Sequence, residues 1–310
     1  MDFSLTPDQQ LLSDTGRKVL ERECPPALVR AHIDDPSAHE PLWRHLAEYT
    51  ALGNGPATDL CLFLEQTGYV AAPGPFLATT GYLALTGDED ATGTVALVDD
   101  PTHRFVLEAD RVGRIAVVLP GPRLAVIDAV DAPARLVPTV DYSRRLFLLD
   151  LPALDAQPLA ADAYALWRDR SYACMAAEMV GTARRIFDMS LAYAKERKQF
   201  DVPIGSFQAI QHKLADMSLA LERATAAVHY AAMSIDGDDP ERTRACHVAK
   251  AAAGEAARRI LKDGIQIHGG IGYTWEHDLH LFLRRSTADE YLFGTTGWHL
   301  DRLAELLIDS

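Results

Sequence analysis

The feature that most constrains the fold of this chain is a stripe of apolar residues along its C-terminal half. Apolar side chains recur at alternating spacings of three and four residues, at Phe207, Ile210, Leu214, Met217, Leu221, Ala224, Val228 and Ala231. This spacing places them on one face of an α-helix, as in helices that pack within a bundle. A second stripe with the same spacing runs from Tyr172 to Tyr193. The two stripes predict two long helices that pack through their apolar faces.

Two further segments complete a predicted C-terminal bundle. A helix rich in small residues begins at Asp239-Pro240 and includes Ala251 to Ala253, where small side chains permit close helix contact. A fourth helix runs from about Gly297 to Leu307. Four helices in up-and-down order are typical of a bundle, which we place at residues 153–310.

The first part of the chain predicts helices. Thr6 can cap a helix that has Pro7 at its first position, and Gln9 can reach back to close a capping box. Another helix lies around Leu60–Tyr69 and ends at Gly68 and the Pro73-Gly74-Pro75 break. We therefore place an N-terminal helical domain at residues 1–92.

Between these helical parts the pattern changes to short β-rich runs. They are Val95–Val98, Arg114–Leu119, Leu124–Ile127 and Leu146–Leu149, and Pro-Gly and Asp-rich turns separate them. Such runs predict a small antiparallel sheet or barrel, a reduced β domain at residues 93–152. The fold class is therefore α+β and mostly helical, in three parts.

Composition limits the partners of the chain. Its 310 residues are 48% hydrophobic and 24% charged, which is typical of a soluble globular protein with a sizeable core. A net charge of −14 argues against nucleic acid or an anionic membrane as the main partner. An anionic cofactor would need a local basic cluster, and Arg197-Lys198 and Arg284-Arg285 are the candidates.

The cellular compartment of the chain can be predicted from its targeting signals, its apolar runs and its cysteines. The N-terminus does not have the pattern of a signal peptide, and no apolar run reaches the roughly 20 residues that span a bilayer. The four cysteines are scattered, without a metal-ligand spacing, so we expect structural free thiols: Cys24, Cys61, Cys174 and Cys246. These observations predict a cytoplasmic protein.

Two segments carry the candidate chemistry. Residues 197–208 read RKQFDVPIGSFQ, and residues 266–272 read QIHGGIG. Read alone, Arg197 can simply satisfy the last carbonyls of a helix, and Phe200 can be a core aromatic. The glycines can equally form a helix end, since they follow a helix and not the strand that a dinucleotide-binding loop needs. His268 has no companion at ligand spacing, so a metal site is not predicted.

Taken together and in this order, the two segments resemble the C-terminal signatures of acyl-CoA dehydrogenases, FAD-dependent enzymes that desaturate acyl thioesters between Cα and Cβ. In that family the bundle of one subunit completes the FAD site of its neighbour. The resemblance implies that Arg197 faces the FAD pyrophosphate and that Phe200 and Gln208 contact the nucleotide. It also implies FAD contacts from Gln266, Ile267, His268, Gly269, Gly270 and Thr295. A guanidinium suits phosphate oxygens, and glycines expose N–H groups.

The chain departs from the family at the catalytic base. The usual Glu lies in a turn before the last helix, and the matching position here is Phe293. A minority of members carry it on the first long bundle helix, which matches Ser171. A phenyl ring cannot accept a proton, and a serine hydroxyl is too weak a base alone. Neighbouring carboxylates stay open as substitutes or as structural ion pairs: Asp169, Glu178, Asp289 and Glu290.

The central domain departs too, because residues 94–151 contain no Trp and no convincing flavin-contact segment. The two losses resemble the short subunits of heteromeric (α2β2) acyl-CoA dehydrogenases of actinobacterial sterol breakdown, whose longer partner supplies flavin domain and base. That implies FAD, a longer subunit, a bulky acyl-CoA substrate and an electron-transfer flavoprotein as acceptor. Two alternatives stay open: a self-sufficient homo-oligomer with another base, and a non-catalytic scaffold or binding subunit.

Overall fold

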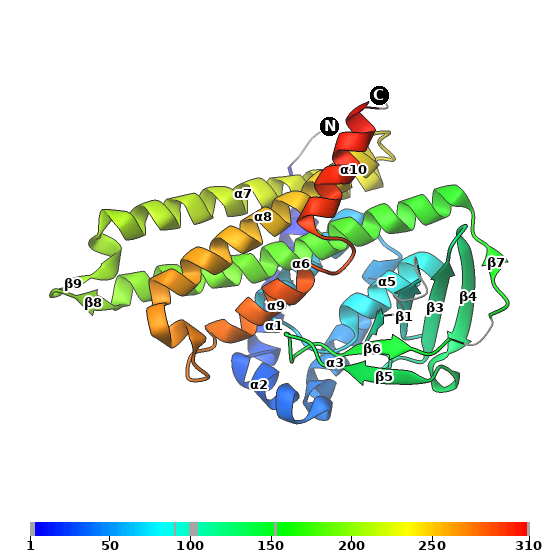
Figure 1. Cartoon of the computed structure of the whole chain (residues 1–310), viewed down its shortest axis with the longest axis horizontal. Coiled ribbons are helices and arrows are strands. Elements are labelled where there is room, and N and C mark those ends of the chain that lie inside the picture. Colours follow the sequence, from blue (N-terminus) through cyan, green and yellow to red (C-terminus); the bar gives the residue numbers. More distant parts are fainter. Residues whose placement is uncertain (1–3, 90, 99–104, 152–153, 309–310) are drawn as a thin grey trace.

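The computed structural model describes residues 4–89, 91–98, 105–151 and 154–308, and it orders the chain as helices, strands and helices (Figure 1). This order confirms the α+β, mostly helical fold class. Among the described residues, no helix is long and apolar enough to cross a membrane, and no three metal-ligating side chains converge. The predicted boundary at residues 152 and 153 falls outside the described residues.

Over residues 4–89, the N-terminal part is built from five α-helices and two 3-10 turns. They are α1 (Pro7–Glu23), α2 (Pro26–Asp34), η1 (Pro36–His39), α3 (Glu40–Leu46), η2 (Ala47–Gly53), α4 (Ala57–Tyr69) and α5 (Phe76–Thr86). The predicted capping box at the start of α1 is confirmed. The Gln9 N–H donates to Thr6 Oγ1 at 3.2 Å, and the Thr6 N–H donates to Gln9 Oε1 at 3.0 Å.

The central part holds two small sheets that share one core. One has the order β1-β3-β4-β7 and the other β2-β6-β5. The strands are β1 (Gly93–Leu97), β2 (Phe105–Leu107), β3 (Arg114–Leu119), β4 (Arg123–Asp128), β5 (Ala134–Val137), β6 (Leu146–Leu149) and β7 (Gln157–Pro158), with a 3-10 turn η3 (Ala129–Asp131). All four predicted runs form strands. Buried side chains such as Val106, Ile115 and Phe147 fill the space between the sheets.

One pairing differs from the predicted antiparallel arrangement. Strands β1 and β3 are parallel, with Val95 opposite Ala116, whereas the other pairs of the two sheets are antiparallel. The chain leaves β1 for β2 in the other sheet before it returns as β3, and this crossover reverses the direction expected of a hairpin.

The C-terminal part is the predicted bundle. Its long helices are α6 (Ala161–Glu196), α7 (Gln208–Asp236) and α8 (Arg242–His268), followed by α9 (Leu279–Asp289) and α10 (Thr296–Ile308). A short hairpin, β8 (Lys198–Gln199) and β9 (Val202–Pro203), and a 3-10 turn, η4 (Ile204–Ser206), join α6 to α7. Another 3-10 turn, η5 (Gly269–Tyr273), follows α8. The apolar stripe from Met217 to Ala231 is buried, as predicted, but Phe207 precedes α7 and is exposed.

The bundle and the N-terminal helices share one apolar core. Buried side chains of α4, α6, α7 and α8 belong to a single cluster that includes Leu64, Met175 and Ile260. Glycines let α4 and α6 approach closely, because a side chain on Gly68 would overlap the backbone of Glu178, and one on Gly181 would overlap that of Glu65. The division into three domains therefore stays a prediction. The four cysteines are free and buried, as expected.

Candidate cofactor edge and acyl cavity

The two signature segments lie at the same end of the bundle (Figure 1). Tyr193, in the last turn of α6, stacks on His268 at the end of α8, with ring centroids 4.6 Å apart. Lys213 of α7 donates to Asp263 of α8 at 2.7 Å. The up-and-down order of the helices thus brings residues 197–208 and 266–270 together, and we refer to these two stretches as the cofactor edge.

The first half of the cofactor edge is exposed. Helix α6 ends at Glu196, and Arg197, Phe200 and Gln208 all lie on the surface. Phe200 sits in the hairpin turn with a left-handed backbone (φ 53°), and its side chain is 87% exposed. The alternative that Phe200 is a core aromatic is therefore wrong. An aromatic side chain held so far out of the core is available to a ligand or to another subunit.

In the second half of the cofactor edge, residues 266–270, some residues are exposed and others are buried. Gln266, Gly269 and Gly270 are exposed, but the side chains of Ile267 and His268 are buried. His268 Nδ1 is hydrogen-bonded to the carbonyl of Gly264 at 2.8 Å. The space beside the two glycines is open, so their backbone can be approached closely. Only the Gln266 side chain and the main chain of this segment face outward.

A separate cavity of about 730 Å³ lies between α5, the strands β1 and β2, α6 and the turn before α10. Ser171 and Phe293, the two positions that the family resemblance assigns to the base, both line this cavity. Thr295 lines it as well. None of the described residues that line it is a carboxylate. The two alternative base positions, more than a hundred residues apart in the chain, thus belong to one acid-free cavity.

The turn that carries Phe293 is firmly held although it has no base. Phe293 adopts a left-handed backbone (φ 57°), and its carbonyl accepts from His299 Nε2 at 3.0 Å. The buried Lys250 donates to the carbonyl of Gly294 at 2.9 Å. Glu290 accepts from the backbone N–H of Thr296 at 2.8 Å and so caps α10. Glu290 therefore has a structural role.

Two buried histidines form a relay at the wall of the cavity. His247 Nδ1 lies 2.8 Å from His299 Nδ1. His299 Nε2 faces a carbonyl and must carry a proton, so its Nδ1 is the acceptor and His247 Nδ1 is the donor. Burial, with Arg168 nearby, lowers the pKa of His247 to about 4, and burial with Lys250 lowers that of His299 to about 3. Both rings are neutral, and the Nε2 of His247 is left as a hydrogen-bond acceptor.

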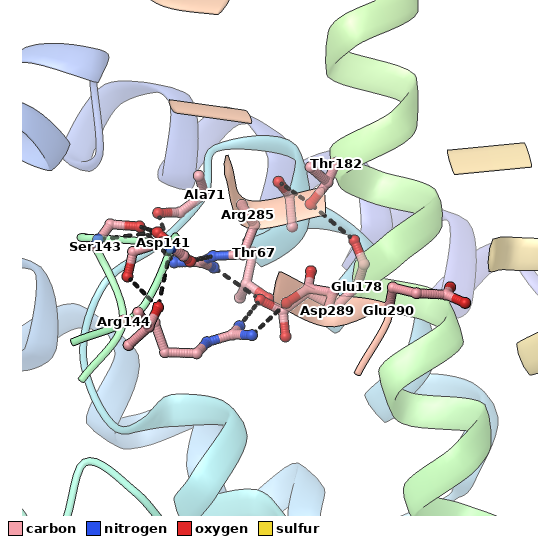
Figure 2. Close-up of polar contacts among 12 residues, drawn as sticks. Thr67, Ala71, Asp141, Ser143, Arg144, Glu178, Thr182, Arg285, Asp289 and Glu290 are labelled. Carbon is pink, nitrogen blue, oxygen red and sulfur yellow. Dashed lines mark hydrogen bonds and ion pairs between the residues drawn. The ribbon is translucent and has the colours of Figure 1, made fainter. Parts of the chain in front are cut away.

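Two of the remaining candidate bases, Glu178 and Asp289, belong to a buried ion network (Figure 2). Arg285 Nε donates to Asp141 at 2.5 Å, and its Nη1 donates to Glu178 at 2.9 Å. Arg144 donates to both Glu178 and Asp289. Arg285 is fully buried, and its guanidinium already pairs with Asp141 and Glu178. The prediction that Arg284-Arg285 could receive an anionic cofactor is therefore wrong.

The candidate carboxylates thus have structural partners and do not line the cavity. Figure 2 shows Glu178 and Asp289 turned toward the two arginines and Glu290 pointing away from them. Asp169 is buried and accepts from Thr243 Oγ1 at 2.7 Å. The alternative that Glu178 pairs with arginine is confirmed, although one partner, Arg144, comes from the loop between β5 and β6 and not from the bundle.

Asp289 should make stability depend on pH. Burial raises its pKa to about 7 although Arg144 opposes the shift. The folded state then holds a proton that the unfolded state loses near pH 4, so this contribution to stability falls as pH rises from about 4 through 7. In Asp289→Asn, the free energy of unfolding in urea should therefore decrease less between pH 5 and pH 8 than it does in the wild type. The control is Asp301→Asn, an exposed residue of α10 outside the network, and an unchanged slope in Asp289→Asn would reject the assignment.

Comparison with known proteins identifies the family. The family model for the acyl-CoA dehydrogenase C-terminal domain matches residues 169–308. Acyl-CoA dehydrogenase IpdE2 of Mycolicibacterium smegmatis is 32% identical over 325 residues, covering 96% of this chain and 98% of the relative. A variant of the Tcur3481-Tcur3483 steroid ACAD has the same fold (TM-score 0.86, 24% identity, 97% of this chain and 98% of the other covered).

A second solved structure shares the fold over its full length. The ChsE4-ChsE5 complex from Mycobacterium tuberculosis superposes with a TM-score of 0.84 at 20% identity, with 100% of both chains covered. The two signature segments, the bundle that brings them together and the full-length relative agree with one another. The chain belongs to the acyl-CoA dehydrogenase family, the FAD-dependent oxidoreductases that act on acyl-CoA thioesters.

Proposed function

We propose that this chain is the short subunit of a heteromeric acyl-CoA dehydrogenase and that it completes the FAD site of a longer partner. The observation that carries this proposal is the acid-free cavity. Phe293 and Ser171 occupy both family positions for the base, and no described residue of the cavity wall is Asp or Glu. Removal of an α-proton needs a base, so the base comes from the partner subunit.

The cofactor edge suits the outer half of an FAD bound mainly by the partner. The Arg197 guanidinium, the Phe200 ring and the glycine backbone at 269 and 270 are all exposed at one end of the bundle. Arginine makes charge-assisted hydrogen bonds to phosphate oxygens, and the open space beside Gly269 and Gly270 lets a ligand approach their main chain closely. When bound, FAD supplies the acceptor for the hydride that leaves Cβ. This chain would hold and orient the nucleotide.

Relatives support the assembly and the substrate class. The ChsE4-ChsE5 structure is a complex, and the Tcur3481-Tcur3483 enzyme is a steroid ACAD. We infer an α2β2 tetramer with two FADs and a bulky, sterol-derived acyl-CoA substrate in this chain as well. An electron-transfer flavoprotein as acceptor and a cytoplasmic location are part of the same proposal.

Arg197→Ala tests the cofactor edge. Losing a charge-assisted bond to a phosphate should weaken FAD binding to the heteromer by roughly tenfold. The measurement is the FAD content of the purified complex, followed by titration of FAD into the stripped complex. Arg223→Ala, an exposed arginine on α7 outside the cofactor edge, is the control and should bind FAD as wild type does. Unchanged FAD affinity in Arg197→Ala would remove this residue from the cofactor site.

A further inference from the structure

We propose that the acid-free cavity of this subunit is itself a binding site for an apolar molecule that ends in a carboxylate. This inference rests on the proposed function, because a subunit whose partner supplies the base has no catalytic use for the cavity. The cavity nevertheless keeps a volume of about 730 Å³, within the range of small-molecule sites. A cavity that had lost all use could be filled by larger side chains, as protein cores usually are.

The walls of the cavity suit a flat, apolar body. Tyr164, Trp167, Phe293 and Trp298 line it from α6, the turn before α10 and α10 itself. Trp167 is fixed by a hydrogen bond from its Nε1 to the carbonyl of Gly81 at 3.1 Å. Aromatic faces of this kind contribute a large apolar contact area and stack on planar ligands.

The charge of the cavity selects an anion. Arg168 and Arg302 line it, and the Nε atoms of both are buried without a hydrogen-bond partner among the described residues. Their acidic neighbours hold them weakly: Arg168 lies 3.8 Å from Asp169, and Arg302 pairs with the exposed Glu305. In a chain of net charge −14, two arginines in a cavity whose described wall has no carboxylate form a local positive site.

His247 adds a fixed polar contact and shows why the site binds without proton transfer. The relay to His299 leaves the Nε2 of His247 as an acceptor. Burial, together with the two arginines near the ring, opposes protonation of His247, so this side chain is suited to accept a hydrogen bond from a ligand hydroxyl and is a poor proton acceptor. The ligand is therefore an apolar ring compound with a carboxylate, and a hydroxyl on its body would find a partner.

A matched pair of probes tests the site. We would titrate 1-pyrenebutyrate and its neutral analogue 1-pyrenebutanol by calorimetry into the full chain and into its complex with the longer subunit. The acid should bind at least roughly tenfold more tightly than the alcohol. Arg168→Gln and Arg302→Gln should each reduce that preference, and Arg244→Gln, an exposed arginine on α8 outside the cavity, should not. Equal binding of the two probes, or no binding of either, would overturn the proposal.

A second variant places the binding in the cavity. Gly81 lines the cavity, and a Cβ atom added there has no heavy atom within 4 Å, so the ring of Gly81→Phe should extend into the cavity and abolish binding of both probes. Binding that survives this change would put the site elsewhere. FAD content separates this proposal from the proposed function: Arg168→Gln should leave the FAD of the complex unchanged, whereas stoichiometric FAD in the lone chain would contradict the half-site function.

Discussion

Arg285→Met is expected to lower the free energy of unfolding of this chain by about 3–5 kcal/mol. The guanidinium of Arg285 is fully buried and donates to Asp141, Glu178 and Ser143. Without it, Asp141 loses its arginine, and Glu178 keeps only Arg144. Breaking a buried ion pair from one side costs about 3–5 kcal/mol, a large fraction of a typical stability of about 5–15 kcal/mol. The measurement is the free energy of unfolding in urea.

Two further variants separate the lost ion pair from a general effect of substitution. Arg284→Met changes the neighbouring residue, whose side chain lies over the Tyr142 ring at the surface, and should cost about 1 kcal/mol or less. The double variant Arg285→Met with Asp141→Asn removes the uncompensated charge and should recover part of the loss. A double variant no more stable than Arg285→Met alone would contradict the account of the network, even where the single variant is insoluble.

Gly181→Ala is the second change with a large expected effect. A methyl group at Gly181 would overlap the carbonyl of Glu65 and approach the Tyr69 nitrogen to 2.9 Å. Gly68, on the facing side, meets the backbone of Glu178 in the same way. Both clashes are with helix backbones, which cannot rotate away as a side chain can, so α4 and α6 must separate. We expect a loss of about 3 kcal/mol in the free energy of unfolding, at the upper end for overpacked cores.

Gly81→Ala is the matched control for that prediction. It is the same substitution inside helix α5, but its added methyl group meets nothing within 4 Å. Alanine is the better helix former, so this variant should be more stable by about 0.5–1 kcal/mol. If the free energy of unfolding falls in Gly181→Ala and rises in Gly81→Ala, the close contact between α4 and α6 is the cause of the loss. A Gly181→Ala protein as stable as wild type would show that the helices do not cross so closely.

The fold was predictable wherever consecutive residues of an element carry a clear apolar pattern. The stripe from Met217 to Ala231 predicted α7, and short β-rich runs bounded by turn residues predicted β1, β3, β4 and β6. Helix α9 was missed because Leu279, His280, Leu281 and Phe282 are all buried, so no one-sided stripe marks it. The strands β2 and β7 span three and two residues, too few to show a pattern, and the residues of β5 are almost all exposed, so no apolar face marks it.

The site was predictable where a short segment carries its own signature. Residues 197–208 and 266–272 indicated the family and, through the helix order, their common end of the bundle. The roles of Glu178 and Asp289 depended on Arg144, which reaches them from a loop of the β domain across a long sequence separation. Lys250 and the relay of His247 and His299 were missed for the same reason, because no local pattern marks side chains that meet only after folding.

The half-site function is tested most directly by the visible spectrum and mass of this chain, purified alone and then co-expressed with a longer acyl-CoA dehydrogenase subunit that carries the base. We predict a colourless lone chain and a yellow α2β2 tetramer with one FAD for each pair of subunits. A lone chain that is yellow and desaturates an acyl-CoA thioester would contradict the account, because it would hold flavin and a base that the described cavity does not contain.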